Sequence, residues 1–282
     1  MKLRIEEDLF LHRQPSMDFL SELTKPLHTE TPPIWNRRKP RCIDGEKEIF
    51  IQEIQVENRF SDPEGLLETA FEDFDRFLSA AGITKGKGYL LSITEGETEC
   101  REAYRIEVGE DECRIIAADT EGVRRAIIFL EDEMYRREGC FLPIGTITRR
   151  PFVKTRMSRC FFAPPSHASN LGMENELASE IDYYPDEYLN RLAHDGVNAL
   201  WLGVTFRELL PSRIIPEFGT DGERRIKKLN EVVAKCRRYG IAIYVFCSEP
   251  ASTFRNPIPY EHHKDVLGVE YLLLHGIRAP IR

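Results

Sequence analysis

Three charged side chains stand just after predicted strands, at the positions where a parallel α/β barrel carries its chemistry. Glu249 follows a strand predicted at 241–247, and Arg207 and Glu208 follow a strand predicted at 198–205. Barrel enzymes build their sites on the loops that follow the strands. A carboxylic acid there can donate a proton to a leaving group, and a carboxylate can stabilise positive charge that develops beside it. We predict that these residues contact a substrate in a complete barrel, the simpler alternative being loop carboxylates paired with arginines.

Two further candidates lie inside predicted strands. Arg159, in a strand predicted at 157–162, has a planar guanidinium that can bind a carboxylate or a pair of hydroxyl groups. Trp201 offers an apolar ring of the kind that stacks on the face of a sugar. Each also has a simpler interpretation: Arg159 as a half-buried ion-pair partner, and Trp201 as a core residue. Both are kept as predicted substrate-binding residues.

Histidine and cysteine spacing predicts neither a metal site nor a cofactor. His167, His194, His262 and His263 do not combine with any cysteine in a spacing that would complete a zinc site. The chain has 7 cysteines and no Cys-x-x-Cys pair, which favours free thiols in a reducing cytoplasm. We therefore expect no metal, no cofactor and a cytoplasmic location.

Alternating strands and helices from residue 151 onward position the candidate residues. Strands at 157–162, 198–205 and 241–247 alternate with a helix that opens at Pro185 and a helix at about 221–239. The second strand is continuously apolar, as parallel strands covered on both faces are. Residues 151–282 thus predict the N-terminal part of a (β/α)8 barrel with about three strands, and 251–282 predict no further long helix or fourth strand.

A smaller α/β domain is predicted before the barrel, at residues 46–150. Its expected order is a strand at 49–56, a helix opened by Ser61-Asp62-Pro63 and closed by Gly82, a strand at 89–93, and a hairpin of 104–108 with 113–117. A helix capped by Asp119 or Thr120 and a closing strand at 142–147 complete it. Residues 1–45, rich in proline and basic side chains, predict an irregular leader. The fold class is α/β, with a small sandwich domain followed by a partial barrel.

The stretch from Tyr104 to Pro250 resembles the family 20 glycoside hydrolases, the β-N-acetylhexosaminidase type. In that family a domain ordered strand, turn, strand, helix, strand precedes a (β/α)8 barrel. The α-glucuronidase branch of these barrels is an equally loose match. The matching segments are Tyr104-Arg105-Ile106-Glu107-Val108, Ile115 to Asp119, Leu192-Ala193 to Gly196-Val197-Asn198, and Arg238-Tyr239-Gly240-Ile241. Pro151 and Arg156 also match the family's Pro-x-Phe-x-x-Arg motif, although Phe152 comes one place early.

The resemblance concerns the scaffold and not the polar residues. The family's sugar-binding Arg position is occupied by Pro164, and an Asp position by Phe161. Its catalytic Asp-Glu pair belongs to a fourth strand that this sequence does not reveal. Other polar positions of the family's pattern fall on Phe206, Arg207, Phe246, Ser248 and Ser252.

The resemblance implies a protein that acts on O-glycosidic bonds of carbohydrates when its barrel is complete, this chain lacking the catalytic acid pair. The alternatives are a non-catalytic module that binds sugar or protein, and an inactive truncated product. A partner or a further C-terminal part would cover the open barrel edge. The net charge of -8 argues against nucleic acid, and the apolar runs are too short to span a membrane.

Overall fold

The computed structural model describes residues 22–29, 47–160, 162–163, 176–204, 206–213, 216–247, 270–274 and 277–281. These residues form two compact units. The first comprises Met1–Arg156, Pro185–Asn198 and Arg237–Ile241, and the second Met157–Tyr184, Ala199–Cys236 and Ala242–Arg282, in each case as far as described. The predicted division at residues 45 and 150 stays a prediction.

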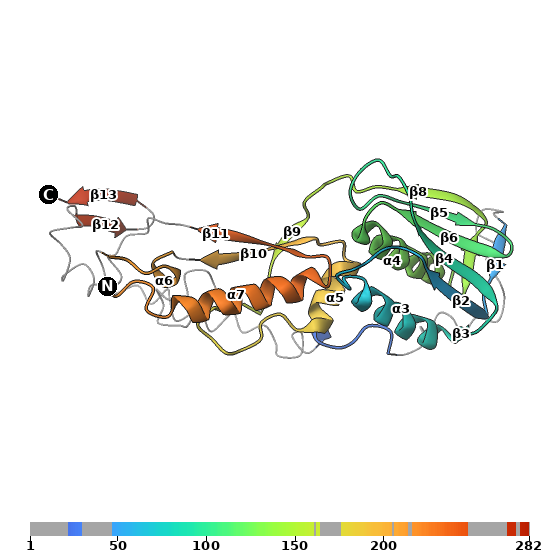
Figure 1. Cartoon of the computed structure of the whole chain (residues 1–282), viewed down its shortest axis with the longest axis horizontal. Helices are drawn as coiled ribbons and strands as arrows, with labels where there is room; N and C mark the ends of the chain where they lie inside the picture. Colours follow the sequence, from blue (N-terminus) through green and yellow to red (C-terminus); the bar gives the residue numbers. More distant parts are fainter. Residues whose placement is uncertain are drawn as a thin grey trace, which may run out of the picture. The chain divides into compact units, whose positions relative to one another are not determined.

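The first unit is built on a six-stranded mixed sheet (Figure 1). The strand order is β3-β2-β4-β6-β5-β8; β2, β3, β4 and β6 run parallel, and β5 is antiparallel to both its neighbours. The hairpin of β5 and β6 confirms the predicted one. The strands are β2 (Glu53–Asn58), β3 (Thr84–Lys85), β4 (Tyr89–Glu95), β5 (Tyr104–Val108), β6 (Glu112–Ala117) and β8 (Gly145–Arg149).

Two predicted strands are each divided in the structure. The strand expected at 49–56 becomes β1 (Glu48–Phe50) and β2, and the strand expected at 142–147 becomes β7 (Phe141–Pro143) and β8. β1 and β7 pair with each other in a separate two-stranded sheet. Gly145 lies between β7 and the rest of β8 with φ of 143°, a backbone conformation that separates the two strands.

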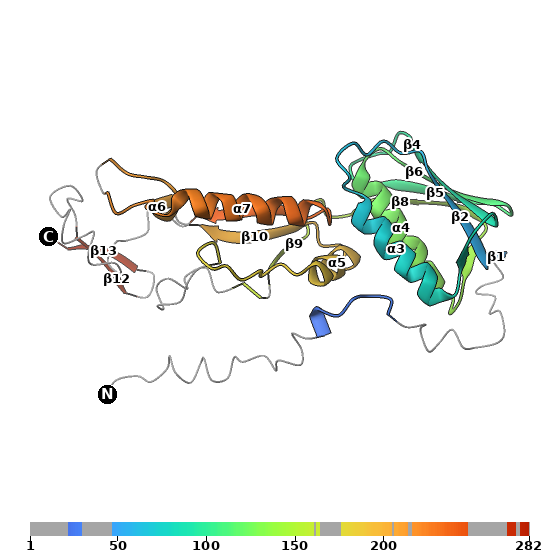
Figure 2. The ribbon, with the colours of Figure 1, turned by 60° about the horizontal axis from the view of Figure 1, so that its bottom comes forward.

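Two helices, α3 (Glu68–Ala81) and α4 (Thr120–Arg136), lie side by side on one face of this sheet (Figure 2). α3 starts later than predicted, because the Asp62 carboxylate accepts the backbone N–H groups of Leu66 and Leu67 and stabilises a turn before the helix. It ends, as predicted, at Gly82 in the left-handed conformation. The Asp119 side chain caps α4 by accepting the N–H of Gly122.

A single apolar core lies between these helices and the sheet. Every member is at most 8 % exposed, so the first unit has a hydrophobic core of its own. The largest fully buried apolar side chains are Phe74, Phe77, Ile51, Leu67, Leu78, Leu91, Ile93, Ile106, Ile115 and Ile127. A further helix, α5 (Asp186–His194), also belongs to this unit.

The second unit contains a three-stranded parallel sheet of order β11-β10-β9 (Figure 1). Its strands are β9 (Met157–Arg159), β10 (Ala199–Val204) and β11 (Ala242–Cys247), with α6 (Phe206–Leu209) and α7 (Gly222–Arg237) between the last two. The chain order β9, α5, β10, α7, β11 is that of the predicted partial barrel, and the predicted fold class is confirmed.

Two short antiparallel strands, β12 (Glu270–Leu274) and β13 (Ile277–Ile281), also occur, which the sequence did not predict. They pair with each other and not with the parallel sheet. None of the described helices combines the length and apolar character that crossing a membrane requires.

Candidate functional site

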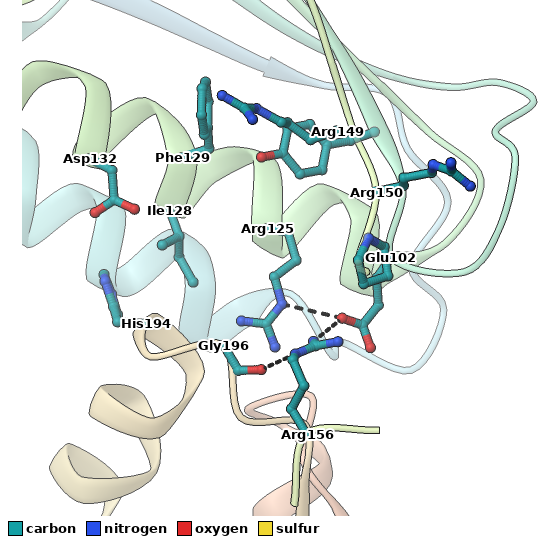
Figure 3. A pocket seen from close by; sticks show the side chains of 12 residues that line it. Glu102, Arg125, Ile128, Phe129, Asp132, Arg149, Arg150, Arg156, His194 and Gly196 are labelled. Atoms are coloured by element: carbon teal, nitrogen blue, oxygen red, sulfur yellow. Dashed lines mark hydrogen bonds and ion pairs between the residues drawn. The ribbon is translucent and has the colours of Figure 1, made fainter. Parts of the chain in front are cut away.

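The first unit contains a pocket of about 360 Å³ (Figure 3). Arginine is its commonest lining residue, and aromatic and aliphatic side chains of β5 and α4 form its apolar part. Its lining residues are Glu102, Tyr104, Arg125, Ile128, Phe129, Asp132, Arg149, Arg150, Pro151, Arg156, His194 and Gly196.

Glu102 is the centre of the pocket's polar contacts. Its carboxylate accepts hydrogen bonds from Asn198 Nδ2, at 2.6 Å, and from an Arg156 guanidinium nitrogen, and it lies 3.5 Å from Arg125 Nε. Arg156 also donates to the Gly196 carbonyl oxygen, and Figure 3 shows these groups converging. The Pro-x-Phe-x-x-Arg motif thus supplies, through Arg156, a contact that ties the segment after β8 to residues 196–198.

The backbone of Glu102 has φ of 66°, in the left-handed region that residues other than glycine seldom occupy. Its N–H donates to the Asp119 carboxylate at 3.0 Å, which helps to hold this conformation. Burial alone would raise the pKa of Glu102, but the hydrogen bonds from Asn198 and Arg156 outweigh it and hold the pKa below its usual range. Glu102 is therefore an ionised structural carboxylate and not a proton donor.

Two of the arginines that line the pocket have further contacts. The Arg149 guanidinium lies 5.2 Å from the ring centroid of Phe129, within the range of a cation–π contact. Arg125 donates to the Ala193 carbonyl oxygen of α5. Burial raises the pKa of Asp132. Of the two carboxylates that line the pocket, Glu102 is the one already bound by arginines.

A second group of polar side chains is buried in the same unit and contains four metal-ligating residue types. His28, Asp73, Glu131 and His194 each offer one ligand atom, and these four atoms lie within 4.8 Å of one another. His194 Nε2 is 2.7 Å from Asp73 Oδ2 and 3.8 Å from Glu131 Oε2. His28 Nε2 is 3.5 Å from Asp73 Oδ2 and 3.3 Å from Glu131 Oε2. We refer to these four residues as the His-carboxylate cluster.

The electrostatics of the cluster favour positive charge. Burial alone would lower the pKa of His28, but the carboxylates of Asp73 and Glu131 raise it to about 9. Burial opposes ionisation of Asp73, yet its contacts with His194 and His28 hold its pKa well below the usual range. Burial raises the pKa of Glu131. The cluster is the only group of this kind among the residues that the structure describes.

The structure brings together two of the residues predicted to bind substrate. The Arg159 guanidinium lies 5.2 Å from the Trp201 ring centroid, a cation–π contact, and the Trp201 ring meets Phe246 edge-on at 5.7 Å. Glu208 Oε2 is 3.5 Å from Arg225 Nη1, so the carboxylate takes part in the ion pair that the simpler interpretation expects. Whether these residues contact a substrate stays a prediction.

The other two predicted residues cannot be compared with the structure. Glu249 and the side chain of Arg207 lie outside the described residues. One acid that the sequence did not suggest is Glu176, which is 8 % exposed and accepts a hydrogen bond of 2.6 Å from the Tyr184 hydroxyl. Burial raises its pKa.

The sequence also missed three members of the His-carboxylate cluster. Among the four, only His194 is a predicted candidate, and the spacing of histidines and cysteines predicts no metal site. A signal was present in α4, where Glu131 occupies a position four residues after Ile127 and three before Met134, on the apolar face. A carboxylate on the buried face of a helix requires a partner, and that requirement predicts a polar cluster.

Comparison with known proteins places the fold. No family model and no curated protein matches the sequence. Among solved structures, an exo-β-N-acetylglucosaminidase of glycoside hydrolase family 20 from Vibrio harveyi matches 89% of this chain with a TM-score of 0.51 at 15% identity. A family 138 enzyme targeting pectin rhamnogalacturonan II matches 69% with a TM-score of 0.50 at 14% identity. The chain has a glycoside-hydrolase-like fold.

The predicted resemblance to family 20 is thereby confirmed as a likeness of fold. This chain spans 42% of the length of the Vibrio harveyi enzyme and 31% of the length of the family 138 enzyme. At 14–15% identity the likeness extends to the arrangement of elements and leaves the chemistry of the site open.

Proposed function

We propose that this chain is the N-terminal part of a carbohydrate-active protein that cleaves O-glycosidic bonds when its barrel is complete, and that the chain alone does not carry the catalytic acid pair. The observation that carries this proposal is the succession of elements. A six-stranded α/β unit is followed in the chain by β9, α5, β10, α7 and β11, and the match to the Vibrio harveyi enzyme extends over 89% of the chain.

The described acids support the second half of the proposal. Hydrolysis of a glycoside requires a protonated acid beside a second carboxylate or equivalent group, both facing the sugar. Glu102 is ionised and held by arginines, Glu208 is paired with Arg225, and Glu176 is buried against Tyr184. No two acids in the described part of the second unit form such a pair at the ends of the parallel strands.

The substrate-contacting part of this chain would then be the strand ends of the second unit. Arg159, the last residue of β9, lies against Trp201, which is within β10, and an aromatic ring beside a guanidinium suits a sugar that carries hydroxyl or carboxylate groups. Glu249 and Arg207 remain predicted contributors to the same surface. Simple N-acetylhexosaminidase activity is not proposed, because Pro164 and Phe161 replace polar residues of that family's pattern.

The test compares this chain with the full product of its gene on aryl glycosides of N-acetylglucosamine, glucuronic acid and rhamnose. We expect release of the aryl alcohol by the full product on at least one substrate and none by this chain. Arg159→Met should raise KM in the full product, whereas Arg105→Met, on an exposed residue of β5, should leave it unchanged.

Two results would contradict the proposal. Hydrolysis by this chain that Glu208→Gln abolishes and Glu180→Gln preserves would place a catalytic acid within it; Glu180 is an exposed acid of the same unit. A full product that neither hydrolyses nor binds any of these sugars would exclude the activity itself.

A second candidate function, a protein-binding module, is favoured by β11. This strand is at the edge of the described sheet, and Tyr244, Val245 and Phe246 on it are 47%, 49% and 54% exposed. Unpaired strand edges with apolar side chains tend to pair with another strand. A further barrel strand or a separate partner protein would satisfy the same edge.

A further inference from the structure

The His-carboxylate cluster combines a set of metal ligands with unsatisfied polar atoms. Both Glu131 carboxylate oxygens and His28 Nε2 are buried and make no well-formed hydrogen bond within the described part of the chain, although His28 Nε2 and Glu131 Oε2 lie 3.3 Å apart as an ion pair. Glu131 is 1 % exposed, and the Asp73 and His28 side chains are 3% and 5% exposed. A buried carboxylate without hydrogen bonds is costly, so an additional group that satisfies it is expected.

From this geometry we infer that His28, Asp73, Glu131 and His194 form a binding site for one divalent transition-metal ion, with zinc as the best fit. Two imidazole nitrogens and two carboxylate oxygens are a ligand set that zinc accepts. The site is independent of the proposed glycosidase function, because it lies wholly within the first unit and uses none of the residues predicted to contact a substrate.

The distances suit a four-coordinate ion. Ligand atoms about 2.0–2.1 Å from a tetrahedral zinc lie about 3.3 Å from one another. The separations between histidine Nε2 atoms and carboxylate oxygens in the cluster are 2.7, 3.3, 3.5 and 3.8 Å, which bracket this value. Since two carboxylates carry two negative charges and neutral imidazoles carry none, a divalent cation would bring the buried site to neutrality.

The surrounding residues orient the ligands as outer partners of metal sites do. The Tyr135 hydroxyl lies 3.1 Å from His28 Nδ1, which leaves Nε2 directed at the carboxylates. Arg76 Nη2 donates to Asp73 Oδ1 at 3.0 Å and leaves Oδ2 for the site. The Phe77 ring contacts the His28 ring edge-on and adds an apolar wall.

The role that this arrangement supports is structural and not catalytic. All four ligands come from protein, which leaves no open coordination position for water or substrate. They also come from four separate elements: the segment 22–29, α3, α4 and the last residue of α5. One ion would therefore link these elements. His194, together with Asp132, also lines the pocket of Figure 3, so the ion could reach the site from solvent through that pocket.

The experiment measures metal content and metal binding in the full chain. The purified protein is analysed by elemental mass spectrometry, then treated with a chelator and titrated with Zn²⁺ and with Co²⁺. We expect one ion per chain, visible absorption bands of tetrahedral Co²⁺, and a rise in melting temperature of about 5–10 °C at a saturating excess of Zn²⁺.

Matched variants assign the binding to these residues. Glu131→Gln and Asp73→Asn should weaken Zn²⁺ binding at least ~10-fold and remove the Co²⁺ bands. Asp75→Asn, on an exposed residue of the same helix that pairs with Lys85, should behave as the unaltered chain. If the first two variants do not fold, by circular dichroism, His194→Gln at the more exposed ligand replaces them, and the Co²⁺ spectrum of the unaltered chain decides the coordination.

The inference is overturned if the unaltered chain binds Zn²⁺ no more tightly than the ligand variants do. It is also overturned if Co²⁺ gives only the weak spectrum of the hexahydrated ion and Zn²⁺ does not change the melting temperature. Either result would identify the cluster as a network of buried hydrogen bonds and ion pairs without a metal ion.

Discussion

The two units use their polar residues differently. In the first unit, several charged side chains are buried and bonded: Arg124 and Arg137 are each 1% exposed, and Glu102 is 5% exposed. In the second unit the described ion pairs are more exposed: the side chains of Arg224 and Asp221 are 45% and 44% exposed, and those of Arg225 and Glu208 are 17% and 21% exposed. There, β11 exposes apolar side chains at the edge of the sheet.

This difference separates structural from functional positions. Buried ion pairs contribute little net stability when intact, but the loss of one member leaves an uncompensated charge. The buried charges of the first unit are therefore needed to keep that unit folded. The second unit places exposed apolar side chains on its edge strand β11 and brings Arg159 against Trp201, so recognition of a further strand, a partner or a sugar is expected there.

Replacing Arg124 by methionine tests this comparison with the largest expected effect. Its guanidinium donates to Glu121 at 3.2 Å, to Thr69 Oγ1 at 3.1 Å and to the carbonyl oxygens of Leu66 and Arg238. Methionine keeps the volume of the stem but removes the hydrogen bonds to the buried Glu121 carboxylate and to the Leu66 and Arg238 carbonyl oxygens, of which the Arg238 oxygen keeps Thr69 Oγ1 as a donor. We expect a loss of about 3–5 kcal/mol in the free energy of unfolding, measured by urea denaturation.

The control for this prediction is Arg105→Met in the same unit. Arg105 is on β5, with a side chain 46% exposed and an ion pair to Glu107. Exposed pairs of this kind contribute about 0–1 kcal/mol. Equal effects of the two substitutions would show that burial does not distinguish the charges of the first unit.

Replacing Glu102 by glutamine tests the pocket and has a pH signature. The amide retains the shape and part of the hydrogen bonding, while the charge that holds Arg125 and Arg156 is lost; we expect about 1–3 kcal/mol less stability near pH 7. Because the pKa of Glu102 is lowered in the folded chain, its contribution is present above the unfolded value of about 4.3. It disappears as the pH falls through the lower folded pKa.

The stabilities of the unaltered chain and of Glu102→Gln should therefore converge in acid. Denaturation at a series of pH values between about 7 and 3 measures this convergence. The control Glu107→Gln, at a β5 carboxylate 36% exposed, should change stability by no more than ~0.5 kcal/mol at any pH. A constant difference between Glu102→Gln and the unaltered chain across the series would mean that charge is not the cause.

The sequence predicted the scaffold better than the site, for a physical reason. Periodicity along one helix or strand is a local property, so α4, the hairpin of β5 and β6, and the parallel strand β10 could be inferred from spacing alone. The predicted start of α3 was wrong, because the Asp62 side chain stabilises a turn and the helix begins only at Glu68.

The polar clusters could not be predicted, because their members are distant in sequence. Glu102 meets Arg156 and Asn198 only after the chain has folded, and His28 reaches Asp73 and Glu131 from another element. A single sequence does not show which distant residues come close together. It does show a carboxylate on the apolar face of a helix, as at Glu131, and this pattern identifies one member of the cluster but not its partners.

The smallest effect on stability and the sharpest test of the second unit come from Val245→Lys. Val245 is 49% exposed on β11, so a lysine there should change the free energy of unfolding by no more than ~0.5 kcal/mol. A charge on an edge strand nevertheless disfavours pairing with another strand. Sedimentation velocity should then show less self-association or partner binding for Val245→Lys than for the unaltered chain. Val153→Lys, at an exposed valine of the first unit, should associate like the unaltered chain. If both variants associate like the unaltered chain, the exposed edge of β11 is not a binding surface. The proposed difference between the two units, one with buried charges and one with an exposed strand edge for binding, is then wrong.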